Sequence, residues 1–241
     1  MDKELNLNEK IKHEKIIDVS NLKKNFKVGD NIIDGIKEID LKVYATDFLV
    51  VFGPSGCGKS TLLNIIAGID TPSEGEVIVR DTNIFKLNED QRAKFRAKKM
   101  GIVHQMPYWI KSLSVVENVA IPLIIEGEKP KYARNKAKEL LNEMGISKLS
   151  YQHPNQLSGG QQQKVGIARA LICNPWILMA DEPTGNLDST SADEIMSLFD
   201  SLNKDRKRTI MMVTHNSAYW GIGTRRVEMK DGLIVKESFN E

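Results

Sequence analysis

The residues best suited to chemistry in this sequence form a glycine-rich segment that follows an apolar run. Residues 53–60 match the pattern G-x-x-x-x-G-K-[S/T] in full. Glycines let backbone N–H groups turn inward around phosphate oxygens, and the helix expected next points its positive end at the same anion. The apolar run Phe48–Phe52 and the helical spacing after the loop are the context that this motif requires. We therefore predict a nucleoside triphosphate site formed by Gly53, Pro54, Ser55, Gly56, Cys57, Gly58, Lys59, Ser60 and Thr61.

Three side chains of this loop have separate expected roles. Lys59 adds a full positive charge at the β- and γ-phosphates, and the Ser60 hydroxyl is suited to bind Mg²⁺. Cys57 stands at a variable position and is interpreted either as a small filler, which we prefer, or as a thiol activated at a helix N-terminus. The loop alone does not distinguish a kinase, a GTPase and an ATPase.

Two adjacent carboxylates follow another buried strand. The apolar run Ile177–Ala180 ends at Asp181 and Glu182. In an open α/β sheet, ligands bind beyond the carboxyl ends of the strands, so the pair and the loop are expected to face one site. Asp181 would bind Mg²⁺ directly or through water, and Glu182 would activate or position the attacking water. The plainer interpretation is a pair of solvated loop acids.

A second helix start also offers groups that bind anions. Leu157–Gln161 reads Leu-Ser-Gly-Gly-Gln, and the helix that it begins extends to about Ile172. Backbone N–H groups of Gly159 and Gly160 and the Ser158 hydroxyl are suited to receive a phosphate. By itself the segment is better explained as a capping box, in which Ser158 pairs with Gln161.

Taken together, these motifs resemble those of ATP-binding-cassette (ABC) ATPases. The Leu-Ser-Gly-Gly-Gln segment is the signature of that family. The order of phosphate loop, Gln105, signature, Asp-Glu pair and His215 is similar to theirs from about Ile16 to Glu237. The resemblance implies hydrolysis of ATP with Mg²⁺ and argues against a nucleotide kinase. It also implies an ATP-dependent, head-to-tail homodimer, in which Ser158 and Gly160 of one copy close on the nucleotide held by the other.

The resemblance assigns roles to residues that are otherwise ambiguous. Gln105 would sense Mg²⁺ and the attacking water, although it also fits a polar residue at a strand end. His215 would contact the γ-phosphate, whereas a lone histidine after a strand is usually just solvated. Asp188 would lie at the dimer seam. Phe26 stands where the family has an aromatic side chain, more often tyrosine, that stacks on adenine, and it fits a core position equally well.

Other segments resemble the exporter-type group, which includes lipoprotein-release, macrolide-export and cell-division members. They are Asp-Glu-Pro-Thr-Gly-Asn-Leu-Asp at 181–188, Val-Glu-Asn-Val-Ala-Ile-Pro-Leu at 116–123 and Gly-Ile-Asp-Thr-Pro-Ser-Glu-Gly-Glu-Val at 68–77. The resemblance implies a separate integral membrane permease, with export or mechanotransmission of a lipoprotein, peptide or drug. The alternative is an ATP-driven signalling module of a membrane complex that transports nothing, since both share every motif.

The chain departs from this group without losing a catalytic group. The departures are Thr46-Asp47, His104, Asn216 and the unfamiliar segment Tyr219–Gly223. Residues 106–110, Met-Pro-Tyr-Trp-Ile, are unusually aromatic and apolar. Either they belong to the core, or Tyr108, Trp109 and Ile110 help form a groove that receives a cytoplasmic helix of the membrane subunit.

Periodicity predicts the elements that must position these residues. Residues 16–26 and 32–43 alternate as half-buried strands do, and further strands are expected at 48–52, 76–80, 177–180 and 209–213. Helices are expected after the loop and at 88–97, 131–144 and 189–202, and a hairpin at 227–235 turning at Asp231-Gly232. This order predicts a mainly parallel α/β sheet with an antiparallel β edge. Together with the resemblance, it implies the P-loop NTPase (RecA-like) fold of ABC ATPases.

We expect a flexible tail at 1–15 and one domain at 16–241. Its core lobe covers about 16–106 and 158–241, and an inserted α-helical subdomain covers about 107–157.

Composition limits the classes of partner and the cellular compartment that are expected. The net charge is +2 without a basic run, so no nucleic-acid partner is expected, and two cysteines fit a reducing compartment. The N-terminus lacks the apolar core of a signal peptide, and the longest apolar runs fall far short of the roughly 18–20 residues that span a bilayer. We expect a cytoplasmic protein, peripheral on the inner face of the cell membrane, with another chain crossing it. Cassettes of DNA repair or translation fit poorly, because no heptads separate loop and signature and only one cassette is present.

Overall fold

The computed structural model describes residues 14–240. The tail predicted at residues 1–15 lies outside this range except for its last two residues. Lys15 already belongs to the first strand, β1 (Lys15–Val28), so the strand starts one residue earlier than predicted.

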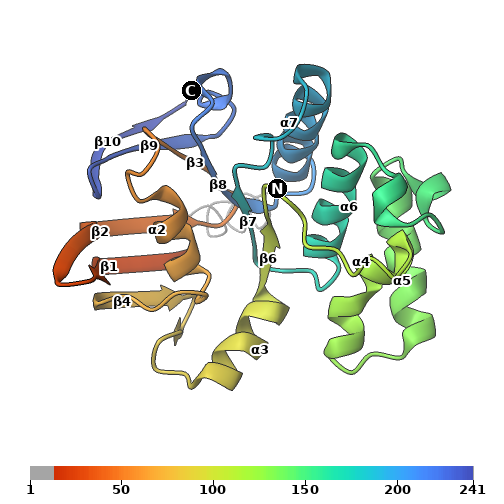
Figure 1. Ribbon diagram of the computed structural model, residues 1–241, viewed down its shortest axis with the longest axis horizontal. Helices are drawn as coiled ribbons and strands as arrows, with labels where there is room; N and C mark the ends of the chain where they lie inside the picture. Colours follow the sequence, from red (N-terminus) through yellow and green to blue (C-terminus); the bar gives the residue numbers. More distant parts are fainter. Residues whose placement is uncertain (1–13, 241) are drawn as a thin grey trace, which may run out of the picture.

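Six strands form the central sheet (Figure 1). In spatial order they are β10 (Leu233–Phe239), β9 (Arg225–Lys230), β3 (Phe48–Phe52), β8 (Thr209–Thr214), β7 (Ile177–Asp181) and β6 (Met100–Val103). All neighbours are parallel except β10 with β9. The predicted parallel sheet is confirmed, and the hairpin turns at Asp231 and Gly232, both at positive φ, as predicted. The sequence prediction missed β6, whose four residues are too few for a periodic pattern.

A second sheet of antiparallel strands lies to one side of the central sheet (Figure 1). Its order is β2 (Asn31–Tyr44), β1, β4 (Glu74–Val79) and β5 (Thr82–Asn83). The predicted antiparallel strands are confirmed, but they form a sheet of their own instead of the edge of the parallel one. The reason is packing: their buried faces share one core with α2 (Lys59–Ile66) and with Leu49 and Val51 of β3. The helix after the phosphate loop is therefore held between two sheets.

Helices cover the opposite side of the central sheet (Figure 1). The predicted insert contains α4 (Val115–Ile125), α5 (Pro130–Glu143) and the short helices η1 (Ser147–Leu149) and η2 (Pro154–Gln156). Of these, α4, α5 and η1 pack with α6 (Gly159–Leu171), α7 (Ser189–Lys204) and the other face of β3, at Phe48 and Val50, in a second core. Two further helices lie outside this group. α3 (Glu89–Lys99), which is capped by Asn88, precedes β6, and η3 (Ser217–Tyr219) follows β8. Between residues 14 and 240, no helix is both long and apolar enough to cross a bilayer.

Candidate active site

The glycine-rich loop joins the end of β3 to the start of α2, and two of its glycines are required by close backbone contacts. Gly53 has φ 153°, and a Cβ there would lie 2.1 Å from Met229 O. Gly58 has φ 102°, and a Cβ there would lie 2.6 Å from Gly35 O. Any side chain at either position would push the loop away from the strands that support it. The loop is therefore shaped by tertiary contacts on both of its sides.

Lys59 lies inside this loop. Its side chain is buried, and its Nζ donates hydrogen bonds to Gly53 O and Pro54 O, both at 2.9 Å. An ammonium held there strengthens the attraction of the loop for an anion, because burial weakens the screening of its charge.

The loop opens onto a cavity of about 380 Å³, a volume typical of a site for a small organic ligand. The lining consists of residues from the loop, Glu182 and residues from the β1–β2 hairpin. The lining residues are Phe26, Ile33, Asp34, Gly35, Ser55, Gly56, Gly58, Lys59, Ser60, Thr61 and Glu182.

Ser60 and Asp181 meet at the floor of the site. Ser60 Oγ donates to Asp181 Oδ1 at 2.9 Å. Burial raises the pKa of Asp181; the Ser60 hydrogen bond lowers it and the charge of Glu182 raises it further. A hydroxyl and a partly desolvated carboxylate this close are oxygen ligands of the kind that Mg²⁺ binds. No group of three or more His, Cys, Asp or Glu side chains in the described chain forms a metal site, and a Mg²⁺ shared with phosphates does not need one.

Glu182 and His215 form a pair beside this floor. His215 Nδ1 lies 2.8 Å from Glu182 Oε1, and the His215 backbone N–H donates to Glu182 Oε2 at 3.3 Å. The Glu182 side chain is 15% exposed, whereas that of His215 is 57% exposed. Glu182 has φ 47°, an uncommon conformation for a residue with a side chain, and its N–H donates to Val213 O at 3.0 Å. The end of β7 thus turns sharply and brings the acid under the histidine that follows β8.

Gln105 lies outside this group. Its Nε2 donates to Asn186 Oδ1 at 3.3 Å, and a Cβ added at Gly185 would lie 2.6 Å from the same nitrogen. Among the described residues, no hydrogen bond links Gln105 with Ser60 or Asp181. In this conformation the Gln105 amide is directed to the loop after Glu182 and away from Ser60 and Asp181.

The signature segment and Asp188 lie together on another part of the surface. Ser158 caps α6 in the expected capping box, with the Gln161 N–H donating to Ser158 Oγ at 3.3 Å. Asp188 caps α7 through the Ser191 N–H at 2.9 Å, which is the main reason that the pKa of Asp188 is lowered. A Cβ at Gly160 would lie 3.0 Å from Ser191 Cβ, so the two helix starts are in contact. Ser158, Gly159 and Gly160 are absent from the lining of the cavity at the glycine-rich loop, which we call the phosphate cavity.

The β1–β2 hairpin forms a further wall of the cavity, with Phe26, Ile33, Asp34 and Gly35. Phe26 pairs in register with Ile33, and its side chain is 38% exposed. A Cβ at Gly35 would lie 2.5 Å from Phe26 Cε2, so the ring packs directly on this glycine. The sequence prediction named Phe26 but missed Ile33, Asp34 and Gly35. A glycine inside a predicted strand was the available signal, since it often marks a close approach.

Burial bears on two side chains, Cys57 and Trp109, for which the sequence left two interpretations open. Cys57 is 4% exposed and packs in the first core, which agrees with a small filler. Trp109 is partly buried against the second core, its Nε1 donates to Gln162 Oε1 at 2.9 Å, and the Arg169 guanidinium lies 4.6 Å from its ring centroid. Trp109 therefore belongs with the core, whereas Tyr108 beside it is 76% exposed.

Comparison with known proteins identifies this arrangement. The family model described as ABC transporter matches residues 36–185. The lipoprotein-releasing system ATP-binding protein LolD of Colwellia psychrerythraea is 40% identical over 226 residues, which cover 94% of this chain and 88% of LolD. The macrolide export ATP-binding/permease protein MacB of Syntrophobacter fumaroxidans is 40% identical over 225 residues, covering 92% of this chain and 32% of MacB.

A solved structure with the same fold is that of the ATP-binding cassette MJ0796 of Methanocaldococcus jannaschii, a dimer in a post-hydrolysis state bound to ADP and Pi. It superimposes with a TM-score of 0.86 and 38% identity, covering 93% of this chain and 99% of that one. The chain therefore belongs to the family of ABC transporter ATP-binding proteins and is an ATPase of that type.

Proposed function

We propose that this chain is the ATP-hydrolysing subunit of a membrane exporter, in which closing of two cassettes drives a separate permease. One observation carries the proposal: the phosphate cavity contains the loop and Glu182, while the signature residues lie elsewhere, beside Asp188. A site divided in this way is completed when two copies pair head to tail. The dimeric state of the similar cassette MJ0796 supports this arrangement.

Binding of ATP uses groups along the whole cavity. The adenine stacks on Phe26 at the hairpin end, and backbone N–H groups between Gly56 and Thr61 surround the phosphates. Lys59 turns from its two carbonyl partners in the loop to the β- and γ-phosphates. Ser60, Asp181 and, after it turns away from Asn186, Gln105 would hold Mg²⁺, which would supply positive charge to neutralise the phosphates.

Hydrolysis uses the pair at the ends of β7 and β8. Glu182 accepts a proton from the attacking water, and its fixed backbone holds the carboxylate toward the cavity. His215 binds Glu182 through Nδ1, which leaves Nε2 to contact a γ-phosphate oxygen. From the second copy, the Ser158 hydroxyl and the N–H groups at Gly159 and Gly160 stabilise the same phosphate, with Asp188 at the seam.

Replacing Glu182 by glutamine tests this mechanism. The change keeps the shape of the side chain but removes its ability to accept the proton, so we expect kcat to fall by about 10²- to 10⁴-fold. ATP should then hold the protein as a dimer, which light scattering after size-exclusion chromatography detects as twice the monomer mass. Lys59→Ala in the same background is the matched control and should remain a monomer. A monomeric Glu182→Gln protein with ATP demonstrably bound would contradict the proposal.

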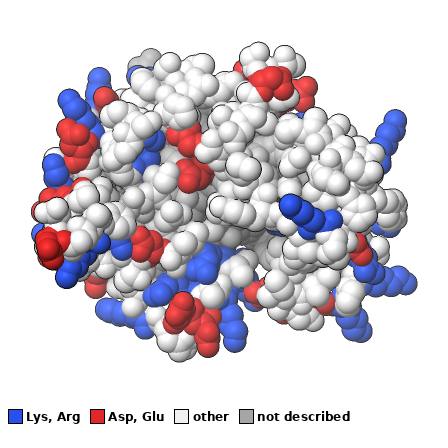
Figure 2. Space-filling view, in the orientation of Figure 1, with Lys and Arg blue, Asp and Glu red and all other residues white. Residues whose placement is uncertain are grey.

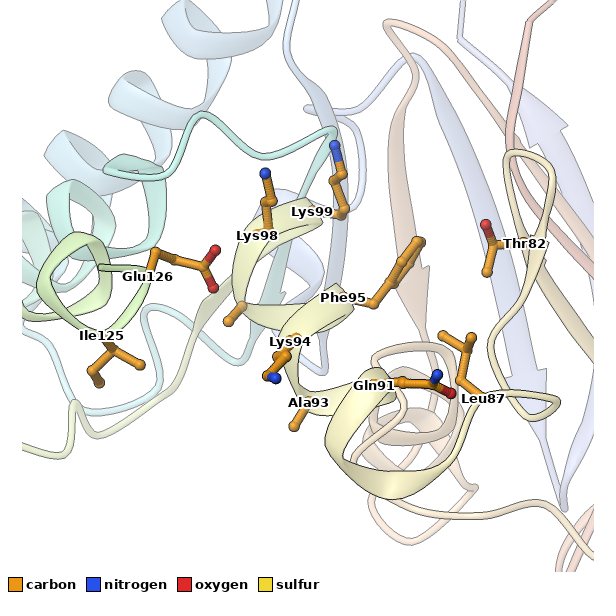
Figure 3. A pocket seen from close by; sticks show the side chains of 11 residues that line it. Thr82, Leu87, Gln91, Ala93, Lys94, Phe95, Lys98, Lys99, Ile125 and Glu126 are labelled. Carbon is orange, nitrogen blue, oxygen red and sulfur yellow. The ribbon is translucent and has the colours of Figure 1, made fainter. Parts of the chain in front are cut away.

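A groove between α3 and α4 supports docking of a permease (Figure 3). A cavity of about 820 Å³ is lined from α3 by Gln91, Lys94, Phe95, Lys98 and Lys99, from the end of α4 by Ile125 and Glu126, and by Thr82 and Leu87. A second hollow of about 430 Å³ shares Ala93, Ala97 and Ile125 with it and extends to Tyr108. Together the two hollows form one groove with an apolar floor.

The charge of this groove indicates what binds there. Lys and Arg side chains lie over this region beside Asp and Glu side chains (Figure 2). Lys94, Lys98 and Lys99 line the groove together with one acidic residue, Glu126 (Figure 3). We infer that the occupant is a cytoplasmic helix of the permease with an apolar face and acidic side chains. The relative MacB, by its name, joins an ATP-binding part and a permease in one chain, and the match to the present chain covers 32% of MacB. The chain would then lie in the cytoplasm at the inner face of the cell membrane and power export of a lipoprotein, peptide or drug.

Reversing the charge of the groove tests the docking. Lys94→Glu with Lys98→Glu should abolish co-purification with the permease and stimulation of ATPase by it, while the isolated chain keeps its own ATPase. Lys136→Glu with Lys138→Glu, on exposed parts of α5, is the matched control. Loss of permease binding in both double variants would show that the effect is one of overall charge, and unchanged binding in both would remove this groove from the proposal.

A further inference from the structure

The segment after His215 contains residues that the proposed function leaves unexplained. It joins β8 to β9 and includes the short helix η3. Asn216 caps this helix, accepting from the Ala218 N–H at 3.0 Å, while its own N–H donates to Thr214 Oγ1 at 3.0 Å. These two hydrogen bonds couple the position of His215 to the position of η3.

Trp220 connects this segment to the strand that precedes the phosphate loop. Its ring stacks on Phe52, with centroids 4.2 Å apart and an angle of 24° between the planes. Phe52 is the last residue of β3 and is followed directly by Gly53. Trp220 Nε1 is buried without a hydrogen-bond partner among the described residues, so stacking and packing hold the ring in place.

Tyr219 connects the same segment to α7. Its hydroxyl donates to Asp193 Oδ1 at 2.9 Å. Asp193 lies in the second turn of the helix that Asp188 caps at the proposed dimer seam. Two consecutive aromatic residues therefore join the histidine loop to the strand before the phosphate loop and to the helix after the seam.

The far end of the segment is fixed independently. A Cβ at Gly223 would lie 2.4 Å from Phe48 O, so the backbone packs directly on β3 there. The Thr224 hydroxyl accepts from the Phe48 N–H at 3.0 Å, and Asn240 Nδ2 donates to Gly221 O at 3.1 Å. The His215 end starts directly at the end of β8 and contacts Glu182 and Thr214. Trp220 and Tyr219 lie between these two fixed ends and restrain the loop that joins them.

We propose that Trp220 is a positioning residue for hydrolysis, which by stacking on Phe52 holds His215 in contact with Glu182, with Tyr219 supporting it through Asp193. The inference rests on the role proposed above for His215. Without the indole ring, the loop samples arrangements in which the histidine is displaced, so fewer ATP-bound molecules have both groups in place. This lowers kcat, whereas KM for ATP changes little because binding uses the phosphate loop and Phe26.

The test measures ATPase kinetics of Trp220→Ala, Trp220→Leu and Trp220→Phe, each with and without His215→Ala. We expect kcat to fall about tenfold in the Ala and Leu variants, with KM within about twofold, and Phe to restore most of the activity because it can stack. In the His215→Ala background, the Trp220 changes should cause no further loss, because a residue that acts through the histidine has nothing left to position. Trp176→Ala is the matched control, because Trp176 is also partly buried but precedes β7, at the opposite end from Asp181. The Trp176→Ala variant should have the same kcat as the wild-type protein.

The outcomes distinguish a positioning role of Trp220 from a purely structural one. Losses that multiply in the double variants, or an unchanged kcat in a folded Trp220→Leu protein, would overturn the positioning role. An equal loss in Trp176→Ala would show that kcat follows stability alone and would also overturn it. If His215→Ala itself keeps full activity, the role proposed for His215 fails, and the failure is visible before any Trp220 variant is considered. If Trp220→Ala does not fold, the Leu and Phe variants carry the comparison.

Discussion

Gly35 offers a direct test of which end of the cavity binds the base. A Cβ at this position would lie 2.5 Å from Phe26 Cε2, whereas nonbonded carbon atoms prefer about 3.5–4.0 Å. Gly35→Ala therefore requires the ring to move by about 1 Å or more, which it can do because the side chain is 38% exposed. The ring then no longer lies where adenine would stack on it.

The expected loss follows from the strength of stacking. One base stacked on an aromatic side chain contributes about 1–3 kcal/mol, and each 1.4 kcal/mol changes Kd about tenfold. Gly35→Ala should thus weaken ATP binding by about 5- to 150-fold while leaving the affinity for tripolyphosphate, which contacts only the phosphate loop, unchanged. The fold itself should not suffer, because alanine in a strand restricts the unfolded chain more than glycine does.

Isothermal titration calorimetry of ATP and of tripolyphosphate separates the contribution of base stacking from that of the phosphate loop. The Glu182→Gln background prevents hydrolysis during the measurement. Phe26→Ala is the control: on this background, adding Gly35→Ala should cause no further loss, because the overlap is gone. An equal loss for ATP and tripolyphosphate would show that the loop itself was distorted. Unchanged ATP binding would refute the stacking of adenine on Phe26.

Three further predictions concern single residues of the site. Asp181→Asn should lower kcat at least about 100-fold by removing a Mg²⁺ ligand. Burial raises the pKa of Asp181, so the ionised carboxylate destabilises the ATP-free fold at neutral pH. The Tm of Asp181→Asn should therefore exceed the wild-type Tm at pH 7, and this difference in Tm should shrink as the pH falls toward about 4. Asp188→Ala removes the cap of α7, which should cost about 1 kcal/mol and lower Tm by about 2–4 °C, as calorimetry can measure. Cys57→Ala should keep ATPase activity, and mass spectrometry should show that iodoacetamide labels Cys173 before the buried Cys57; loss of activity in this variant would favour a role for the thiol.

The sequence by itself determined the features whose causes lie within a few residues. The phosphate loop, the capping box at Ser158 and the Asp231-Gly232 turn all depend on local hydrogen bonds and backbone conformations. The buried strand Phe48–Phe52 followed from an unbroken apolar run. In each case a residue and its neighbours carry the information, so a single sequence was sufficient.

Only the tertiary structure decided which distant residues meet. It showed that the antiparallel strands form their own sheet around α2, that Gly35 packs under Phe26, and that Trp109 is part of the core while Tyr108 faces the groove. No local pattern encodes such contacts, because they depend on how the whole chain fills space. The stacking of Trp220 on Phe52 is of the same kind: 168 positions separate the two rings, and only the packing of β3 beside β8 and β9 brings them together.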